Sequence, residues 1–251
     1  MKSPTILPEV CDAPTYAEMI REMQSYRNVA EINMLFSLDD IEKYKSGKYP
    51  WTHPNTDWFA ETLKKYSTTR NHNLSVSGVT QAVTYYGSFG SQFDDGIFKN
   101  SAASYKRYNL KASVDAKVNK YFSFGVDMTG SQENTMLPTR GEWNVFSMFR
   151  RSKPTDPAFY PNGLPGPDIE YGDNPVVISG LDPGYDDTKT YRLNTILSAT
   201  LNVPGVSGLT LSGYYAYDKY FNVRKLFEKP YTLYSLDTQA YLNAGNTGIE
   251  D

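Results

Sequence analysis

The sequence predicts an all-β fold: a partial transmembrane antiparallel β-barrel whose strands follow one another as an up-and-down meander, with short helices in an N-terminal loop region. Two observations carry this prediction. Apolar and polar residues alternate over segments longer than ordinary globular strands, and short connections between these segments take turns with long ones. The composition agrees, because tyrosine, which is enriched in strands, accounts for 21 of the 251 residues.

The alternation is strictest from Tyr108 to Val118, where every second residue is apolar. Such a period describes a sheet with one apolar and one polar face. A strand of this length spans roughly 36 Å, and at about 45° of tilt it covers the ~25 Å apolar band of an outer membrane. Ordinary globular strands have only about 5–6 residues. The same period predicts strands at 73–78, 83–90, 108–118, 122–129, 191–203 and 209–218, with a possible last strand at 231–236.

The connections differ in length in a regular way. Those at 79–82, 119–121 and 204–208 are short, whereas those at 91–107 and 131–190 are long. Transmembrane barrels show this pattern because their periplasmic turns are tight and their external loops are extended. We therefore divide the chain into a loop region with short helices at 1–72, before the second barrel strand, six or seven antiparallel barrel strands at 73–236 with a long external loop at 131–190, and an unfinished loop at 237–251.

The N-terminal loop region contains signals for short helices. Thr15 with Glu18, and Ser37 with Asp40, have the spacing of capping boxes. A third short helix is predicted at 57–65. The apolar faces of these helices are brief, and none of them predicts a domain core of its own.

The two faces of the predicted sheet have different environments. The polar parity, which includes Lys111 and Arg192, is expected to face the barrel lumen, and aromatics near strand ends, such as Tyr108 and Tyr191, fit the girdles at membrane interfaces. A soluble β-sandwich core would produce the same alternation, so this second fold stays open. In the barrel interpretation the apolar parity faces lipid, and its members are Leu110, Val114, Val118, Phe124, Leu193, Leu197 and Leu201.

Composition and spacing exclude several classes of site. The net charge of −3 indicates no polybasic surface for nucleic acid. One cysteine, Cys11, and two histidines, His53 and His72, are too few for a cysteine- or histidine-rich metal site. Asp94 and Asp95 are adjacent in a strand and point to opposite faces, so they do not converge on one bond. We therefore expect no catalytic residues, no metal ion and no cofactor.

The long external loop carries the candidate substrate-binding residues. Aromatic rings stack on sugar rings or on peptide side chains, and arginines bind carboxylates in a bidentate way. Packing of the loop against its neighbours would employ the same aromatics, so this alternative also stays open. The candidates are Trp143, Phe146, Phe149, Arg150, Arg151 and Tyr160.

Several stretches of the early strands are similar in order and spacing to one protein family. They lie at 55–59, 70–78, 83–89, 95–100, 105–110 and 114–118, and the segment 36–47 upstream resembles a loop of the same family. This region, about residues 36–130, resembles the SusC/RagA family of TonB-linked outer-membrane proteins, in the early barrel just after the plug domain. Beyond it the likeness is mainly to the barrel pattern.

The resemblance implies a function as well as a fold. It implies a segment of a TonB-dependent receptor in the outer membrane that imports oligosaccharides or peptides, with a SusD-like surface lipoprotein and the TonB complex as partners and outer-membrane lipid around it. Family members are longer and carry a signal peptide and a plug; neither is found in this chain, which we therefore expect to be a fragment. The alternative is a soluble β-sandwich module that binds carbohydrate through the loop at 141–160.

Overall fold

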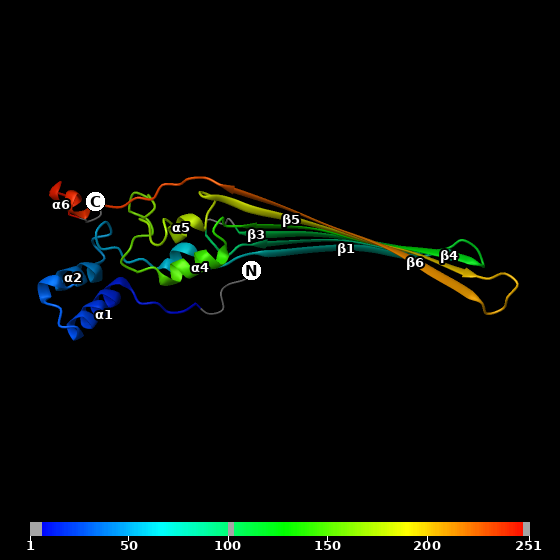
Figure 1. Ribbon diagram of the computed structural model, residues 1–251, viewed down its shortest axis with the longest axis horizontal. Coiled ribbons are helices and arrows are strands. Elements are labelled where there is room, and N and C mark those ends of the chain that lie inside the picture. Colours follow the sequence, from blue (N-terminus) through cyan, green and yellow to red (C-terminus); the bar gives the residue numbers. More distant parts are fainter. Residues whose placement is uncertain (1–6, 100–102, 248–251) are drawn as a thin grey trace.

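The computed structural model describes residues 7–99 and 103–247. Six strands form one antiparallel sheet in chain order, and each strand pairs with the next (Figure 1). The all-β meander predicted from the sequence is therefore confirmed, as an open sheet that is compatible with part of a barrel. The strands are β1 (Thr69–Val79), β2 (Val83–Asp95), β3 (Ser104–Lys117), β4 (Phe122–Leu137), β5 (Gly184–Asn202) and β6 (Thr210–Glu228).

The two ends of the sheet differ. The hairpins β1–β2, β3–β4 and β5–β6 close at one end through short turns, which we call the turn end. The long connections and the helices gather at the opposite end, which we call the cap end (Figure 1). The helices are α1 (Ala13–Tyr26), a 3₁₀ turn at Glu31–Asn33, α2 (Leu38–Ser46), α3 (Trp58–Thr62), α4 (Glu142–Arg151), α5 (Pro175–Ile178) and α6 (Thr238–Asn243).

The strand register separates apolar from polar side chains. Residues directly opposite each other in an antiparallel pair lie on the same face. One cross-strand row therefore places Gly78, Tyr85, Val114, Val126, Leu197 and Tyr215 together. The side of the sheet that carries this row is the apolar face, and the side that carries Lys111 and Asp115 is the polar face.

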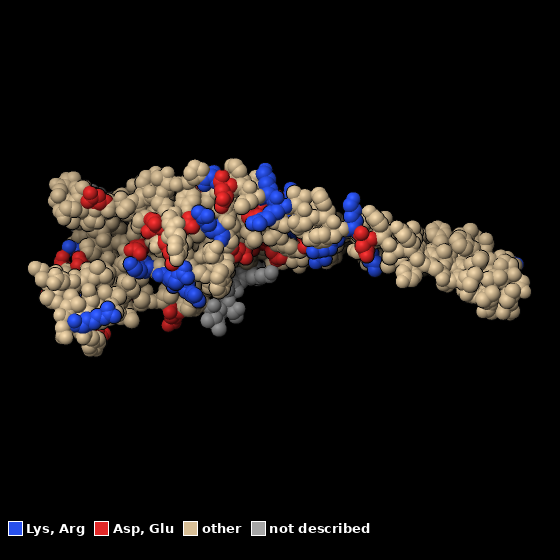
Figure 2. Space-filling model, in the orientation of Figure 1, with Lys and Arg blue, Asp and Glu red and all other residues tan. Residues whose placement is uncertain are grey.

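The apolar face is uncovered. Val114 is 38% exposed and Leu110 is 54% exposed, and no second sheet lies against them in the part of the chain that the structure describes. A β-sandwich core would require such a sheet, so the sandwich interpretation is wrong for these residues. Figure 2 shows the charged side chains over the cap and the adjoining part of the sheet. In that view the part of the sheet nearest the turn end is almost free of them.

The strands extend further than the alternation predicted. β4 continues to Leu137 and β5 begins at Gly184, so the connection between them spans 138–183 instead of 131–190. Toward the cap end polar residues such as Gln132 and Lys189 also occupy the apolar face, and the apolar period fades while the ladder continues. β1 likewise begins at Thr69 rather than Asn73.

The possible last strand at 231–236 is not a strand in the structure. Tyr231 and Leu233 pack against the core of the cap instead, and the amide of Leu236 donates a hydrogen bond to the hydroxyl of Tyr160 at 2.9 Å. Tertiary contacts with the cap therefore replace pairing with β6. Of the predicted loop at 237–251, the structure shows α6 at Thr238–Asn243, and the last four residues lie outside the described part.

The cap end has its own apolar core, built from α3, α4 and α5. Phe149 and Ile178 are fully buried in it, and Phe59 meets Phe149 edge to face at 5.0 Å between ring centroids. The indole of Trp58 donates a hydrogen bond to the carbonyl of Lys153 at 2.8 Å. Segments about 90 residues apart in the sequence are thereby joined into one cap at this end of the sheet.

The helices α1 and α2 form a separate small cluster around Ala17, Ile41 and Tyr44. Ser37 and Asp40 make the predicted capping box at α2. The predicted box at Thr15 and Glu18 is wrong, because α1 begins three residues earlier than that box requires and its N-cap, Asp12, accepts the amide of Thr15 at 3.0 Å. In the described residues no helix combines the length and the apolar character needed to cross a membrane.

Candidate functional site

The candidate binding surface lies on α4, in the connection between β4 and β5. Gly141, whose φ of 74° lies in the left-handed region that favours glycine, turns the chain into this helix. Val145, Met148 and Phe149 form its buried side. The helix period therefore fixes which side chains of α4 remain at the surface.

Three of the predicted substrate-binding residues lie together on the exposed side of α4. Trp143, Phe146 and Arg150 are separated by three and four residues, which places them on one face of a helix. Trp143 is 73% exposed. We call these three residues the α4 stripe. It combines two aromatic rings with a guanidinium group, which suits a sugar ring or a peptide that carries a carboxylate.

The side chains of the other three predicted residues are engaged in contacts within the protein. Phe149 is only 1% exposed and packs between Phe59 and Phe146, so the prediction that it contacts substrate is corrected to a core role. Arg151 makes an ion pair with Glu170 at 2.5 Å. Tyr160 is buried, and its ring stacks on Trp51. The sequence indicated the aromatic content of this segment but not the helical phase that decides burial.

An aromatic stack that the sequence did not indicate lies at the edge of the cap. The ring of Trp51 is placed between Tyr160 at 5.8 Å and Tyr241 of α6 at 5.7 Å, with small interplanar angles to both. A hollow of about 370 Å³ beside it is lined by His53, Phe159 and Tyr160, among others. The stack joins segments more than 100 residues apart, and no local sequence pattern reports such a contact.

Polar contacts fasten the long connection to the cap end of the sheet. Arg140 lies 3.1 Å from the carboxylate of Asp173 and 3.9 Å from that of Glu228 in β6. The hydroxyl of Tyr231 donates a hydrogen bond to Asp173. Burial, followed by this bond to a carboxylate, raises the pKa of Tyr231 to about 12, so the hydroxyl keeps its proton at neutral pH.

The polar face carries a charged network close to the cap end. Glu133 of β4 lies 2.7 Å from Arg192 and 3.7 Å from Arg107, so it bridges β3 and β5. Arg224 binds both carboxylate oxygens of Asp186, at 2.8 and 2.6 Å. Such cross-strand pairs fix the positions of long side chains that would otherwise move freely.

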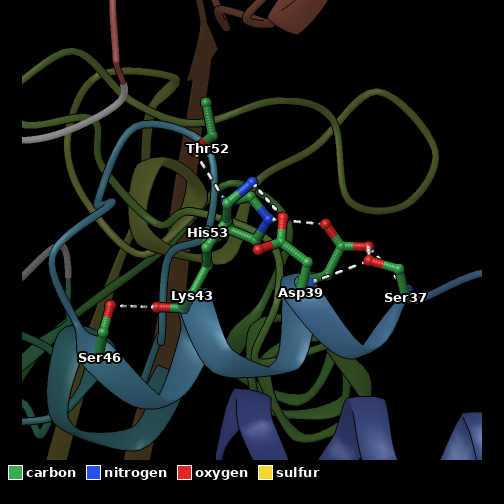
Figure 3. A network of polar contacts seen from close by, with 7 residues as sticks. Ser37, Asp39, Lys43, Ser46, Thr52 and His53 are labelled. Atoms are coloured by element: carbon green, nitrogen blue, oxygen red, sulfur yellow. Dashed lines mark hydrogen bonds and ion pairs between the residues drawn. The ribbon is translucent and has the colours of Figure 1, made fainter.

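A network of polar groups surrounds His53 in the N-terminal region (Figure 3). Its Nε2 lies 3.1 Å from Asp40, and its Nδ1 lies 2.9 Å from the hydroxyl of Thr52. Ser37 binds the other oxygen of the same carboxylate at 2.7 Å. Burial acts to raise the pKa of Asp40, but hydrogen bonds from Ser37 and His53 outweigh it and hold the pKa below its usual value.

This network does not have the arrangement of a hydrolase triad. A triad needs the histidine between the serine and the carboxylate. Here Ser37 and His53 both bind Asp40, and the carboxylate lies between them. The group instead caps α2 and ties it to the loop at 49–53. Within the described residues, no set of three His, Cys, Asp or Glu side chains is arranged to hold a metal ion.

The comparisons with known proteins yield structures only: no family model and no curated protein matches the chain. The RagAB peptide importer in its "open-open" state has a TM-score of 0.53 and 17% identity over 82% of this chain and 25% of its own. The RagAB peptide transporter has a TM-score of 0.51 and 19% identity, and the match covers 83% of this chain and 23% of that chain. The "closed-closed" importer has a TM-score of 0.47, with 19% identity over 67% and 19%.

The two neighbours with TM-scores above 0.5 share the fold of the chain. At 17–19% identity the likeness concerns the antiparallel meander and not the chemistry of particular residues. The chain spans about a quarter of the length of the two chains with the higher TM-scores. The transport of peptides is therefore stated of those proteins and not of this chain.

Proposed function

We propose that the chain is a barrel segment of a TonB-dependent outer-membrane transporter that imports peptides or oligosaccharides with a surface lipoprotein. The observation that carries the proposal is the uncovered apolar face of the six-stranded sheet. Soluble proteins rarely leave so continuous an apolar surface in water. A lipid bilayer is the environment in which it is stable.

The dimensions of the apolar face support a membrane location. Apolar residues occupy it from Val118, the first residue after the turn end of β3, to Tyr108. These ten residue-to-residue steps span about 33 Å, or roughly 23 Å across a membrane at about 45° of tilt. Tyr108 and Tyr191 lie on one cross-strand row at the far limit of this band. Aromatic residues in this position are typical of membrane interfaces.

The edges of the sheet support its place within a larger barrel. β1 and β6 are the outer strands, and each has one edge without a strand partner among the described residues. An unpaired edge in hydrocarbon is very costly, because no water satisfies its backbone groups. In the proposal, further strands of the same barrel pair with both edges, and the polar face lines the lumen.

The orientation follows from the connections. Tight turns belong to the periplasmic side of outer-membrane barrels and long loops to the outside. The cap end, with the α4 stripe, is then on the cell surface, where incoming substrate and a lipoprotein would meet it. The family resemblance of residues 36–130 supports the lipoprotein and the TonB complex as partners, and fold similarity to two RagAB structures agrees with it.

Binding at the α4 stripe is tested by calorimetric titration of the full chain in detergent micelles with a mixed peptide pool and, separately, with a mixed oligosaccharide pool. We expect heat of binding with one of the pools and its loss in Trp143→Ala. The matched control is Tyr171→Asn, which removes another exposed ring of the same connection and tolerates the left-handed φ of 58° there. Equal binding by Trp143→Ala and the unchanged chain would remove the stripe from the proposed site.

A further inference from the structure

A row of cations lies on the apolar face, immediately beyond the tyrosine row. The register places Arg70 opposite Phe93, Phe93 opposite Lys106, Lys106 opposite Asn134 and Asn134 opposite Lys189. Arg70, Lys106 and Lys189, which we call the basic row, therefore stand on alternate strands. Alternate strands are about 9.6 Å apart, so the three charges form a regular line.

The basic row is placed at the limit of the apolar band. Tyr108 and Tyr191 lie two residues closer to the turn end than Lys106 and Lys189 on the same strands. In a membrane protein these tyrosines mark the headgroup level. The cations two residues further out, about 6.6 Å along the strand, then reach the phosphate layer of the leaflet on the cap side.

The local geometry leaves room for a ligand between two of the cations. A surface hollow of about 330 Å³ is lined by Arg70, Lys106, Phe93, Tyr108 and His72, together with neighbouring β2 residues. The ammonium group of Lys106 lies 5.7 Å from the ring centroid of Phe93, which holds the lysine over the hollow. Arginine and lysine side chains that converge in this way bind phosphate groups.

Cations outnumber carboxylates on the apolar face around the basic row. The two carboxylates there are Asp95, which binds Lys64 at 2.8 Å, and Asp187, which lies 3.7 Å from Lys189. Lys225 adds a further cation opposite Asp187. Closer to the turn end, Lys219 on the edge strand β6 is the only charged side chain on the described part of the apolar face. An anionic partner is therefore favoured at the cap end of this face and not at the turn end.

From this arrangement we infer that the basic row binds the phosphate headgroup of an anionic membrane lipid in the leaflet on the cap side. The lipid's acyl chains lie along the apolar face below. A hollow beside Gly130, lined by Tyr191, Leu193, Phe221 and the side chain of Lys219 among others, offers space for a chain along its apolar residues. The inference rests on the proposed function, because it requires the apolar face to contact lipid.

The test uses the full chain in phosphatidylcholine vesicles that contain a small amount of spin-labelled phosphatidic acid or, in parallel, spin-labelled phosphatidylcholine. Electron paramagnetic resonance reports the fraction of each labelled lipid that the protein immobilises. We expect the chain to prefer phosphatidic acid and the preference to fall about five-fold in Lys106→Gln. The double variant Arg70→Gln/Lys106→Gln should lose about 25-fold if the two cations act independently.

The matched control is Lys111→Gln, which removes an exposed cation of the same strand on the polar face and should leave the preference unchanged. Equal immobilisation of both lipids would overturn the headgroup site and leave the lipid-facing assignment standing. Displacement of phosphatidic acid by inorganic phosphate alone would also overturn it, in favour of a free anion site. If neither lipid is immobilised, the proposed function fails together with the inference.

Discussion

Replacing Val114 with lysine tests the environment of the apolar face. Val114 of β3 lies near the middle of the apolar band, which runs from Tyr108 to Val118, and is surrounded on its row by Tyr85, Val126 and other uncharged residues. A lysine at the bilayer midplane of a barrel costs about 2–4 kcal/mol on the lipid face. The free energy of unfolding of Val114→Lys in lipid should fall by this amount, an equilibrium change of about 30- to 900-fold.

Urea titration of the chain folded into phosphatidylcholine vesicles, followed by tryptophan fluorescence, measures this free energy. The control is Ser113→Lys, on the neighbouring residue of the polar face, which should change it by no more than about 0.5 kcal/mol. An exposed sheet position in water would tolerate both changes equally. Equal free energies for the two variants would therefore refute the assignment of the apolar face to lipid.

Three further predictions concern the cap and the N-terminal helices. Phe149→Ala should destabilise the cap by about 3–5 kcal/mol, because it empties a fully buried site, and hydrogen exchange of α4 amides measures it. Tyr160→Phe should cost about 0.5–1.5 kcal/mol, because the amide of Leu236 loses its acceptor; exchange of that amide should accelerate without change in α4. Asp40 has a folded-state pKa below 3.8, so its contribution to stability is complete above pH 3.8 and is lost as the pH falls through the folded-state pKa. Circular dichroism of the helices between pH 5 and 2 should show this loss of stability in the parent chain. The variant Asp40→Asn should not show it.

The sequence predicted the strands best where one face is apolar. From 108 to 118 and from 191 to 203 the alternation marks strand, face and register parity, and β3 and β5 include all of these segments except the last residue of each. Near the cap end β4 and β5 carry polar residues such as Gln132 and Lys189 on the apolar face, so they pair in the ladder there without an apolar signal. The hydrophobic period indicates burial or lipid contact, and it does not show where the backbone pairing of the strands begins and ends.

The candidate site was predicted only in part, for a related reason. Trp143, Phe146 and Phe149 follow at intervals of three, and the pattern alone does not show which of them faces the core. The structure resolves this through α3 and α5, which cover Phe149 and leave Trp143 exposed. Likewise, the stack of Trp51 with Tyr160 and Tyr241 depends on tertiary contacts that no local spacing encodes.

The opposite exposure of adjacent strand residues to lipid and to water can be measured with nitroxide labels. The variants Leu110→Cys and Lys111→Cys, each in a Cys11→Ser background, carry the label on the apolar and polar faces of β3. With the chain in lipid vesicles, we predict that oxygen relaxes the label at 110 strongly and a water-soluble nickel chelate relaxes it weakly, with the reverse at 111. Equal access of the nickel chelate to both labels would contradict the account.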